Sequence, residues 1–143
     1  EICACLVGSE MCIRDSAYGV SVGNTYVEIS INQQHMWYYK NGKLVVETDV
    51  VTGNYGTNDT PKGAYSIIYK ASPATLMLNS HVTFWLPFTS DGCGIHDASW
   101  RASWEYGGTR YKGHGSHGCV NTPYNAAKKI YNNISSGTRV VVY

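Results

Sequence analysis

From residue 25 onward, hydrophobic and polar positions alternate with the period of two that is typical of half-buried β-strands. In the segment 25–32, which reads TYVEISIN, valine and isoleucine alternate with Glu28 and Ser30. This pattern predicts a strand whose valine and isoleucine side chains face the core. We expect Glu28 and Ser30 to point outward.

Several later segments have the same strand-like pattern. The runs 35–40 and 43–53 are separated by the pair Asn41-Gly42. Asn-Gly between two such runs predicts a β-hairpin, because both central residues tolerate a positive φ angle. Other strand-like runs follow at 64–70, 82–88 and 138–143. Pro87 indicates an edge strand or a bend, since proline has no amide N–H to donate.

One segment has helical periodicity. Between Thr122 and Gly137, hydrophobic side chains recur at spacings of three and four residues. We expect Thr122 to cap the helix, Pro123 to occupy its first turn and Gly137 to end it. The predicted fold class is therefore mostly β, a β-sandwich or open barrel with one C-terminal α-helix.

The first 16 residues have neither periodicity and contain three of the five cysteines. They read EICACLVGSEMCIRDS and resemble the conceptual translation of a sequencing adapter. We therefore assign 1–24 to a non-native or disordered tail and 25–143 to one domain. A natural disordered tail and a metal site on the three cysteines are the alternatives, although Cys-x-Cys followed by a distant Cys is poor spacing for zinc.

Charge, hydropathy and aromatic content indicate which classes of partner this chain is suited to bind. The 143 residues carry a net charge of +1, and lysine and arginine are dispersed, so we expect no nucleic-acid partner. No apolar run of about 18 residues is present, which predicts no membrane insertion of this fragment. The start also lacks a signal-peptide pattern, so any targeting segment is expected upstream. The 12 tyrosines and 4 tryptophans suit a peptide or carbohydrate groove.

The segment 113–123, GHGSHGCVNTP, contains the most reactive residue types. Cys119 lies close to His114 and His117 and just before the predicted helix, so nearby imidazolium and the helix dipole are expected to favour its thiolate. Gly118 permits a sharp turn in which N–H groups around Cys119 converge on an oxyanion. Nucleophile and oxyanion donors together indicate acyl transfer.

Such a nucleophile needs a base, which is commonly remote in sequence. The best candidate is His96, in the glycine-rich stretch GCGIHD at 92–97 that follows a predicted strand. The same stretch contains Cys93. A disulfide between Cys93 and Cys119 remains open at this point.

These residues carry a family resemblance. The run SHGCVN at 116–121, preceded by His96 and by the TPKG loop at 60–63, resembles the L,D-transpeptidase catalytic domain family (YkuD-like) of bacterial cell-wall enzymes. The opening strand and the hairpin resemble that family's N-terminal half, so the resemblance covers 25–143. One departure is the spacer 97–115, whose nineteen residues slightly exceed the usual length and predict an enlarged loop on the acceptor side.

The resemblance implies a secreted peptidoglycan L,D-transpeptidase of the cell wall. The Cys119 thiolate would attack the third residue of a tetrapeptide stem, release D-alanine and leave a thioester. An amine of a neighbouring stem would then resolve the thioester to form a cross-link. The resemblance implies no metal or organic cofactor, and it implies acylation of Cys119 by carbapenems. Because the substrate lies outside the cytoplasmic membrane, we expect an export signal or anchor upstream.

Roles for neighbouring residues follow from the same resemblance. His96 would be the base, oriented by the backbone carbonyl of Asp97, and the N–H groups of Gly118 and Cys119 would form the oxyanion hole. Trp100 and Arg101 are candidate substrate-binding residues because they follow His96 closely. The predicted site comprises the catalytic residues Cys119, His96 and His117; the oxyanion and pocket residues Gly118, Ser116, Asp97 and Asn121; and Trp100 and Arg101.

Two other functions fit the same residues. In an L,D-carboxypeptidase, water would replace the acceptor amine, and the sequence does not separate this activity from transpeptidation. A non-catalytic zinc or wall-binding module would use side chains that are all legitimate zinc ligands, although their spacing is unlike that of structural sites. Its ligands would come from Cys93, His96, His114, His117 and Cys119.

Overall fold

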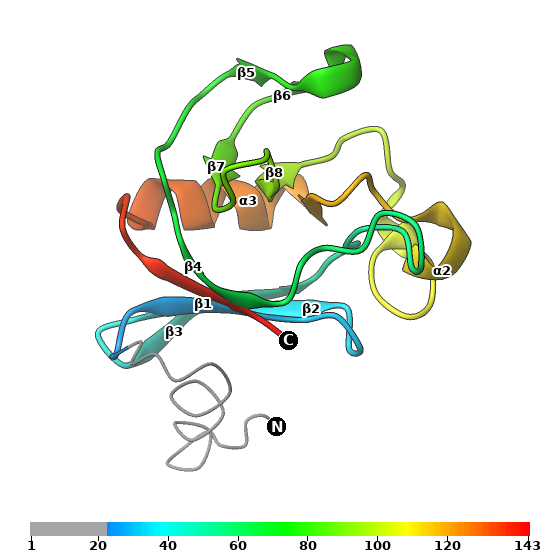
Figure 1. Ribbon diagram of the computed structural model, residues 1–143. Helices are drawn as coiled ribbons and strands as arrows, with labels where there is room; N and C mark the ends of the chain where they lie inside the picture. The colour runs from blue at the N-terminus through cyan, green and yellow to red at the C-terminus, as the bar shows by residue number, and fades with distance from the viewer. Residues whose placement is uncertain (1–22) are drawn as a thin grey trace.

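The computed structural model describes residues 23–143 and has a mostly β fold with one main helix (Figure 1). The tail predicted over 1–24, and the metal site considered on its three cysteines, lie outside the described residues except for a turn at Gly23-Asn24. The strands are β1 (Tyr26–Ser30), β2 (His35–Lys40), β3 (Lys43–Asp49), β4 (Gly63–Ser66), β5 (Ala74–Thr75), β6 (His81–Val82), β7 (Trp85–Pro87), β8 (Gly94–Asp97), β9 (Val120–Thr122) and β10 (Arg139–Val142). The helices are α2 (Tyr111–His114) and α3 (Tyr124–Asn133), with 3₁₀ turns η1 (Met77–Asn79) and η2 (Ser103–Glu105).

The larger sheet has five strands in the order β3-β2-β1-β10-β4. Strand β10 pairs in parallel with β1, so the last strand of the chain lies beside the first. The hairpin between β2 and β3 is confirmed, with φ angles of 52° at Asn41 and 80° at Gly42. Both residues therefore adopt the left-handed conformation that the Asn-Gly pair predicts.

Strand β1 differs from its prediction on one face. Glu28 and Ser30, expected outside, are each only 2% exposed. Because β1 lies between β2 and β10, that face is covered by aromatic side chains of its neighbours. Tyr26 stacks on Tyr39 with ring centroids 5.0 Å apart, and the Tyr143 hydroxyl donates to Glu28 Oε2 at 2.6 Å. Glu28 is thus a buried, hydrogen-bonded carboxyl group.

The smaller sheet has the order β7-β8-β9. The single strand predicted over 82–88 is divided in the structure: β6 forms a two-stranded hairpin with β5, while β7 is an edge of the smaller sheet and ends at Pro87. Strands β8 and β9 are parallel, with His96 opposite Asn121. This pairing brings the two glycine-rich stretches of the sequence together.

Helix α3 is present as predicted, but its ends differ. Thr122 belongs to β9, and Pro123 precedes the helix with no side-chain cap. The helix ends at Asn133 because Ile134 becomes extended and buries its side chain in the core. Gly137, with φ 89°, lies in the turn that leads to β10. The reactive loop is therefore followed by a strand and only then by the helix.

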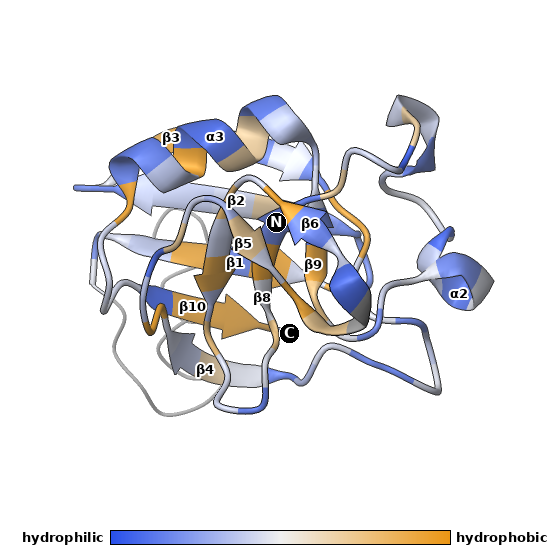
Figure 2. Cartoon of the chain, turned by 90° about the horizontal axis from the view of Figure 1, so that it is seen from above, coloured by the Kyte–Doolittle hydropathy of each residue, from blue (hydrophilic) through white to orange (hydrophobic). Residues whose placement is uncertain are grey.

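The main core lies between the two sheets and α3. Fully buried members come from every layer: Val27 and Ile29 of β1, Ile95 of β8, Val120 of β9 and Ile130 of α3. Figure 2 shows these hydrophobic segments in the middle of the molecule, with the hydrophilic side of α3 outward. Burying each such side chain contributes roughly 1.5–3 kcal/mol. The strands that carry the reactive residues are thus anchored in the core.

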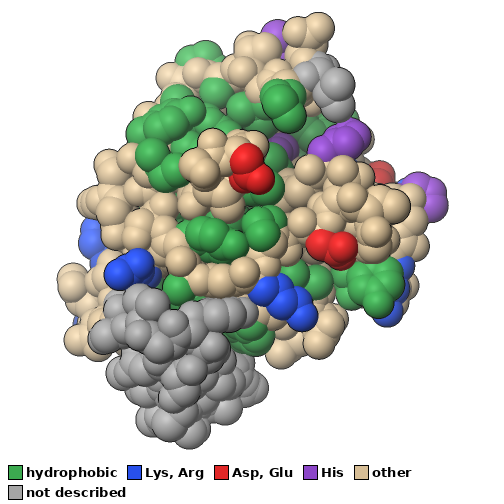
Figure 3. Space-filling view, viewed as in Figure 1, with side chains coloured by type: hydrophobic (Ala, Val, Ile, Leu, Met, Phe, Trp, Pro, Cys, Tyr) green, Lys and Arg blue, Asp and Glu red, His purple; other side chains and the backbone are tan. Residues whose placement is uncertain are grey.

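Within residues 23–143, no helix has the length and apolar character needed to cross a membrane. Figure 3 shows lysine and arginine side chains scattered over one face of the molecule rather than gathered in a patch. This distribution agrees with the dispersed charge read from the sequence.

Candidate active site

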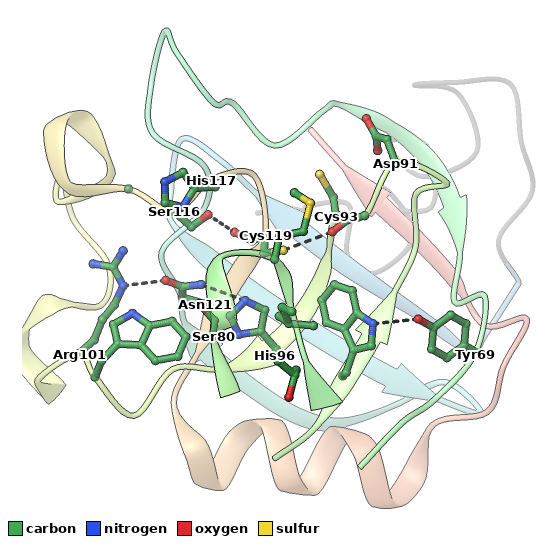
Figure 4. A pocket seen from close by; sticks show the side chains of 17 residues that line it. Tyr69, Ser80, Asp91, Cys93, His96, Arg101, Ser116, His117, Cys119 and Asn121 are labelled. Atoms are coloured by element: carbon green, nitrogen blue, oxygen red, sulfur yellow. Dashed lines mark hydrogen bonds between the residues drawn. The ribbon is translucent and has the colours of Figure 1, made fainter. Parts of the chain in front are cut away.

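A pocket of about 560 Å³ opens where β8 and β9 begin (Figure 4). Strand β8 supplies His96, and the residue directly before β9 is Cys119. The parallel pairing of β8 with β9 is what places these two side chains in the same pocket. Of the predicted site residues, the pocket is lined by Cys119, His96, His117, Ser116, Asn121, Trp100 and Arg101.

The thiol of Cys119 is half-buried and donates to the backbone carbonyl of Gly92 at 3.5 Å. Burial raises the pKa of Cys119 to about 11, an effect that the Gly94 N–H at the sulfur opposes and the neighbouring Cys93 reinforces. The thiol is therefore neutral at neutral pH. The expectation that histidine and a helix dipole favour the thiolate was wrong, because burial dominates and β9 lies between Cys119 and α3.

His96 is buried, and its Nδ1 lies 2.7 Å from the carbonyl oxygen of Asp97. Because a carbonyl only accepts, Nδ1 carries the proton in this contact. Burial lowers the pKa of His96, although the Asp97 carbonyl and carboxylate act in the opposite direction. His96 is thus a neutral imidazole with an unprotonated Nε2, held by the carbonyl contact expected from the sequence.

A chain of hydrogen bonds fixes the other side of the His96 ring. Arg101 Nε donates to Asn121 Oδ1 at 2.7 Å, and Asn121 Nδ2 lies 3.4 Å from His96 Nε2. Since a guanidinium only donates, the Asn121 oxygen faces Arg101 and its amino group faces the ring. Nε2 is therefore the accepting nitrogen, in agreement with the proton on Nδ1.

Arg101 lines the pocket and also belongs to this hydrogen-bonded frame. Its side chain is 9% exposed and also pairs with Glu105 at 3.5 Å. Glu105 lies in η2, within the spacer predicted as an enlarged loop, and a second guanidinium, that of Arg110, lies 3.6 Å away from the same carboxylate. The spacer thus contributes an ordered charged cluster beside the pocket.

The motif loop, residues 113–119, is closed by the hydroxyl of Ser116. Ser116 Oγ donates to the Cys119 carbonyl and accepts from the Gly118 N–H at 3.1 Å. The Gly118 N–H, expected in the oxyanion hole, is therefore already engaged. The Cys119 N–H has no hydrogen-bond partner among the described residues. Gly118 itself has φ 124°, and a Cβ there would lie 3.0 Å from Cys93 Sγ.

The motif loop is also held by residues far from it in sequence. Asn54 Oδ1 accepts from the N–H groups of Gly113 at 3.1 Å and Gly115 at 2.9 Å. The Ser116 N–H donates to the Thr52 carbonyl at 3.0 Å. These contacts fix the backbone that presents Cys119 to the pocket.

Asp97 has a different position from the one expected. Its side chain is buried outside the pocket, where it accepts from the N–H groups of Thr83 at 2.9 Å and Phe84 at 2.8 Å. These residues connect β6 to β7. The Asp97 backbone thus orients His96, while its carboxylate anchors the base of the β5–β6 hairpin.

Two other predicted residues lie at the pocket rim. His117 lines the pocket but is exposed, whereas His96 is buried and oriented by the Asp97 carbonyl, so we propose His96 alone as the base. Trp100 is 53% exposed, and its ring centroid lies 5.9 Å from that of His96. Trp100 is therefore available to a ligand above the His96 ring.

The same pocket bears on the disulfide and on the zinc alternative. Cys93 and Cys119 are both free thiols. Over residues 23–143, no group of three or more His, Cys, Asp or Glu side chains is placed to hold a metal ion. The side chains considered for the zinc module therefore form no such group among these residues.

Several pocket residues are not part of the predicted site. Tyr69, Met77 and Trp85 line the pocket, and the Trp85 indole N–H donates to the Tyr69 hydroxyl at 3.1 Å. Met77 belongs to the connection between β5 and β6, which no periodicity distinguishes. The many tyrosines and tryptophans indicated a groove, but composition does not show which of them line it, and Met77 carries no such signal.

Comparison with known proteins gives a family for this arrangement. Residues 24–142 match the family model described as the L,D-transpeptidase catalytic domain. A search of curated proteins found no match. Among solved structures, a cysteine-to-serine mutant of the Enterococcus faecium L,D-transpeptidase is 41% identical, with a TM-score of 0.80, over 85% of this chain and 50% of that one.

Two further structures define the range of similarity. The catalytic domain of the E. faecium L,D-transpeptidase acylated by ertapenem is 39% identical, with a TM-score of 0.69, over 84% of this chain and 97% of that one. An L,D-transpeptidase from Mycobacterium smegmatis is 19% identical, with a TM-score of 0.72 over 84% of this chain and 58% of that one, and shows the shared fold alone. The chain spans about half the length of the first E. faecium structure.

Proposed function

The chain belongs to the L,D-transpeptidase catalytic domain family of cysteine transpeptidases, and on that premise we propose that Cys119 forms peptidoglycan cross-links by two acyl transfers. The donor would be a tetrapeptide stem and the acceptor an amine of a neighbouring stem. The activity would take place in the cell wall.

In the first transfer, the Cys119 thiol gives its proton to His96 Nε2 as the sulfur attacks the carbonyl carbon of the third stem residue. The resulting oxyanion collapses and breaks the bond to the terminal D-alanine. The leaving amine takes the proton from His96, and a thioester on Cys119 remains.

In the second transfer, the acceptor amine attacks the thioester carbonyl and loses a proton to His96 Nε2. Collapse breaks the carbon–sulfur bond, and the sulfur regains a proton from His96. An amide cross-link is formed and the neutral thiol is restored. Water as acceptor would give a carboxypeptidase instead, with a tripeptide product.

The hydrogen-bond chain Arg101–Asn121–His96–Asp97 is the observation that carries this proposal. It supports a neutral His96 whose Nε2 accepts a proton at the pocket that Cys119 lines. Because the thiol rests on the Gly92 carbonyl with a raised pKa, proton transfer to His96 must accompany the attack. The proposal therefore includes a rotation of the Cys119 side chain from the Gly92 carbonyl toward His96. It also includes release of the 3.4 Å contact between Asn121 Nδ2 and His96 Nε2, because that ring nitrogen has a single lone pair.

The test is intact-protein mass spectrometry of the chain with a tetrapeptide-stem muropeptide, with the muropeptide products analysed in parallel. Wild type should form a thioester adduct and a cross-linked dimer, and Cys119→Ala should form neither. Cys93→Ala is the matched control, since it removes the second thiol of the pocket, and it should retain both products. Tripeptide as the sole product would favour the carboxypeptidase.

The proposal fails if reduced, folded wild type yields neither adduct nor product, or if Cys119→Ala remains active. Ertapenem provides a second acyl donor, because an E. faecium relative has been solved as its acylated form. We expect the ertapenem adduct to map to Cys119.

A further inference from the structure

We propose that Thr60 is a positioning residue that orients the backbone N–H of Cys119 toward the oxyanion formed in acyl transfer. This inference rests on the proposed function, because an oxyanion arises only if Cys119 attacks a carbonyl group. Thr60 lies in the loop before β4 and is 58 residues away from Gly118 in sequence. It is not among the residues that line the pocket.

The Thr60 hydroxyl both donates and accepts a hydrogen bond. It donates to the carbonyl of Gly118 at 2.7 Å and accepts from the N–H of Gly53 at 2.9 Å. Thr60 is 1% exposed. The loop packs tightly there, since a Cβ on Gly53 would lie 1.8 Å from the Asn58 carbonyl oxygen. The hydroxyl hydrogen therefore has one acceptor, and water does not compete for it.

This contact fixes the orientation of the peptide unit between Gly118 and Cys119. The unit is trans, so its C=O and N–H point in opposite directions. The Gly118 carbonyl points to Thr60, and the Cys119 N–H consequently points away from Thr60, which does not line the pocket that Cys119 lines. Of the two N–H groups expected in the oxyanion hole, that of Cys119 has no partner among the described residues, whereas the Gly118 N–H is held by Ser116.

The peptide unit after Gly118 needs such a contact to be held in one orientation. With no Cβ and a φ of 124°, Gly118 has wide conformational freedom, so local sterics do not determine the plane of the peptide that follows it. An oxyanion donor is effective only when it is oriented before the charge develops. The Thr60 hydroxyl supplies that orientation from a separate segment of the chain.

The test compares two reactions of Cys119 in Thr60→Val and Thr60→Ser. Acylation by ertapenem passes through an oxyanion, whereas alkylation by iodoacetamide is a displacement at a methylene carbon and forms none. We expect Thr60→Val, which keeps the shape and loses the hydroxyl, to slow acylation about 10- to 100-fold, less than the loss of a donor itself. Alkylation should stay within about twofold, and Thr60→Ser should restore acylation to within about threefold of wild type.

Each outcome is decisive. Unchanged acylation in Thr60→Val would overturn the inference, as would an equal loss of acylation and alkylation, which would indicate a displaced loop. If Thr60→Val does not fold by circular dichroism, the same ratio is measured in Thr60→Ala, where the same selective loss of acylation is expected. The wild-type result separates the two proposals. If wild type is not acylated, the proposed function is contradicted. If wild type is acylated and the variant without the Thr60 hydroxyl is acylated equally fast, only the role of Thr60 is contradicted.

Discussion

Two loops of this protein each place one cysteine in the same pocket, and they are held in opposite ways. The motif loop, 113–119, is hydrogen-bonded to Thr52, Asn54 and Thr60. The Cys93 turn, 89–94, closes mainly on itself: the Cys93 N–H donates to Thr89 Oγ1 at 2.8 Å. The motif loop is therefore fixed by distant segments as well as by its own Ser116, whereas the Cys93 turn is held mainly by its own residues.

The acidity of the two sulfurs does not separate them. Burial raises the pKa of both Cys93 and Cys119, in Cys93 with a further contribution from the charge of Asp91. What differs is the backbone around each sulfur. The Cys93 N–H donates to Thr89 Oγ1, whereas the Cys119 N–H has no partner among the described residues and follows a carbonyl held by Thr60. Orientation, rather than a lowered pKa, thus distinguishes the proposed nucleophile from its neighbour.

The largest expected effect comes from removing the proposed base. His96→Gln should slow acylation of Cys119 by ertapenem about 10²- to 10⁴-fold, because no group then accepts the thiol proton. The rim histidine is the matched control, and His117→Gln should stay within about threefold of wild type. Equal losses in the two variants would contradict the assignment. Stopped-flow absorbance of the β-lactam measures both rates.

The pH dependence of the wild-type acylation rate is a second test of His96 as the base. Protonation of Nε2 removes the base, and burial lowers the pKa of His96 below its ordinary value of 6.5. Burial also raises the pKa of Cys119 to about 11. The acylation rate should therefore be flat from near neutrality into the alkaline range and fall as the pH drops below 6.5. A steep decline between pH 8 and 7 would contradict a neutral resting pair.

An intermediate effect is expected from Gly118→Ala. The new Cβ would force a non-glycine residue to φ 124° and lie 3.0 Å from Cys93 Sγ. The free energy of unfolding should fall by about 1–3 kcal/mol. Adding Cys93→Ala should restore part of this loss by removing the sulfur. Denaturant unfolding of the single and double variants measures both changes.

Gly92→Ala in the Cys93 turn is the control for that experiment. Gly92 has φ 103°, yet a Cβ there has nothing within 4 Å. The stability loss in Gly92→Ala should come from the strained backbone conformation alone, and it should not depend on Cys93. If Cys93→Ala rescued both alanine variants equally, the close contact between Gly118 and Cys93 would have no energetic role.

The smallest effects are expected from removing one hydrogen-bond acceptor that holds each of the two loops. Asn54→Ala removes the acceptor of two motif-loop N–H groups and should cost about 1 kcal/mol of stability, with acylation slowed several-fold. Thr89→Ala removes the acceptor of the Cys93 N–H. It should cost a similar stability yet leave acylation within about twofold. Thermal unfolding and acylation rates are measured for both, and equal slowing would contradict the difference drawn between the loops.

Some elements of the fold follow from local sequence alone. The Asn41-Gly42 hairpin and helix α3 were predicted correctly because turn chemistry and side-chain periodicity act over a few residues. The buried face of β1 was not predicted, because Glu28 is covered only after β10, more than a hundred residues later, pairs beside it. Thr122 was assigned to a cap because nothing local shows that β8 takes it into a strand.

For the site, the sequence by itself determined the reactive residue types. The run at 116–121 and the distant His96 identified a thiol, a base and a flexible turn, since these are properties of the residues themselves. Only the tertiary structure decided how they work together. Burial set the protonation of the Cys119 thiol, and Thr60, from another loop, fixed the peptide before it. Solvation and hydrogen-bond direction depend on residues distant in the chain, so no local pattern encodes them.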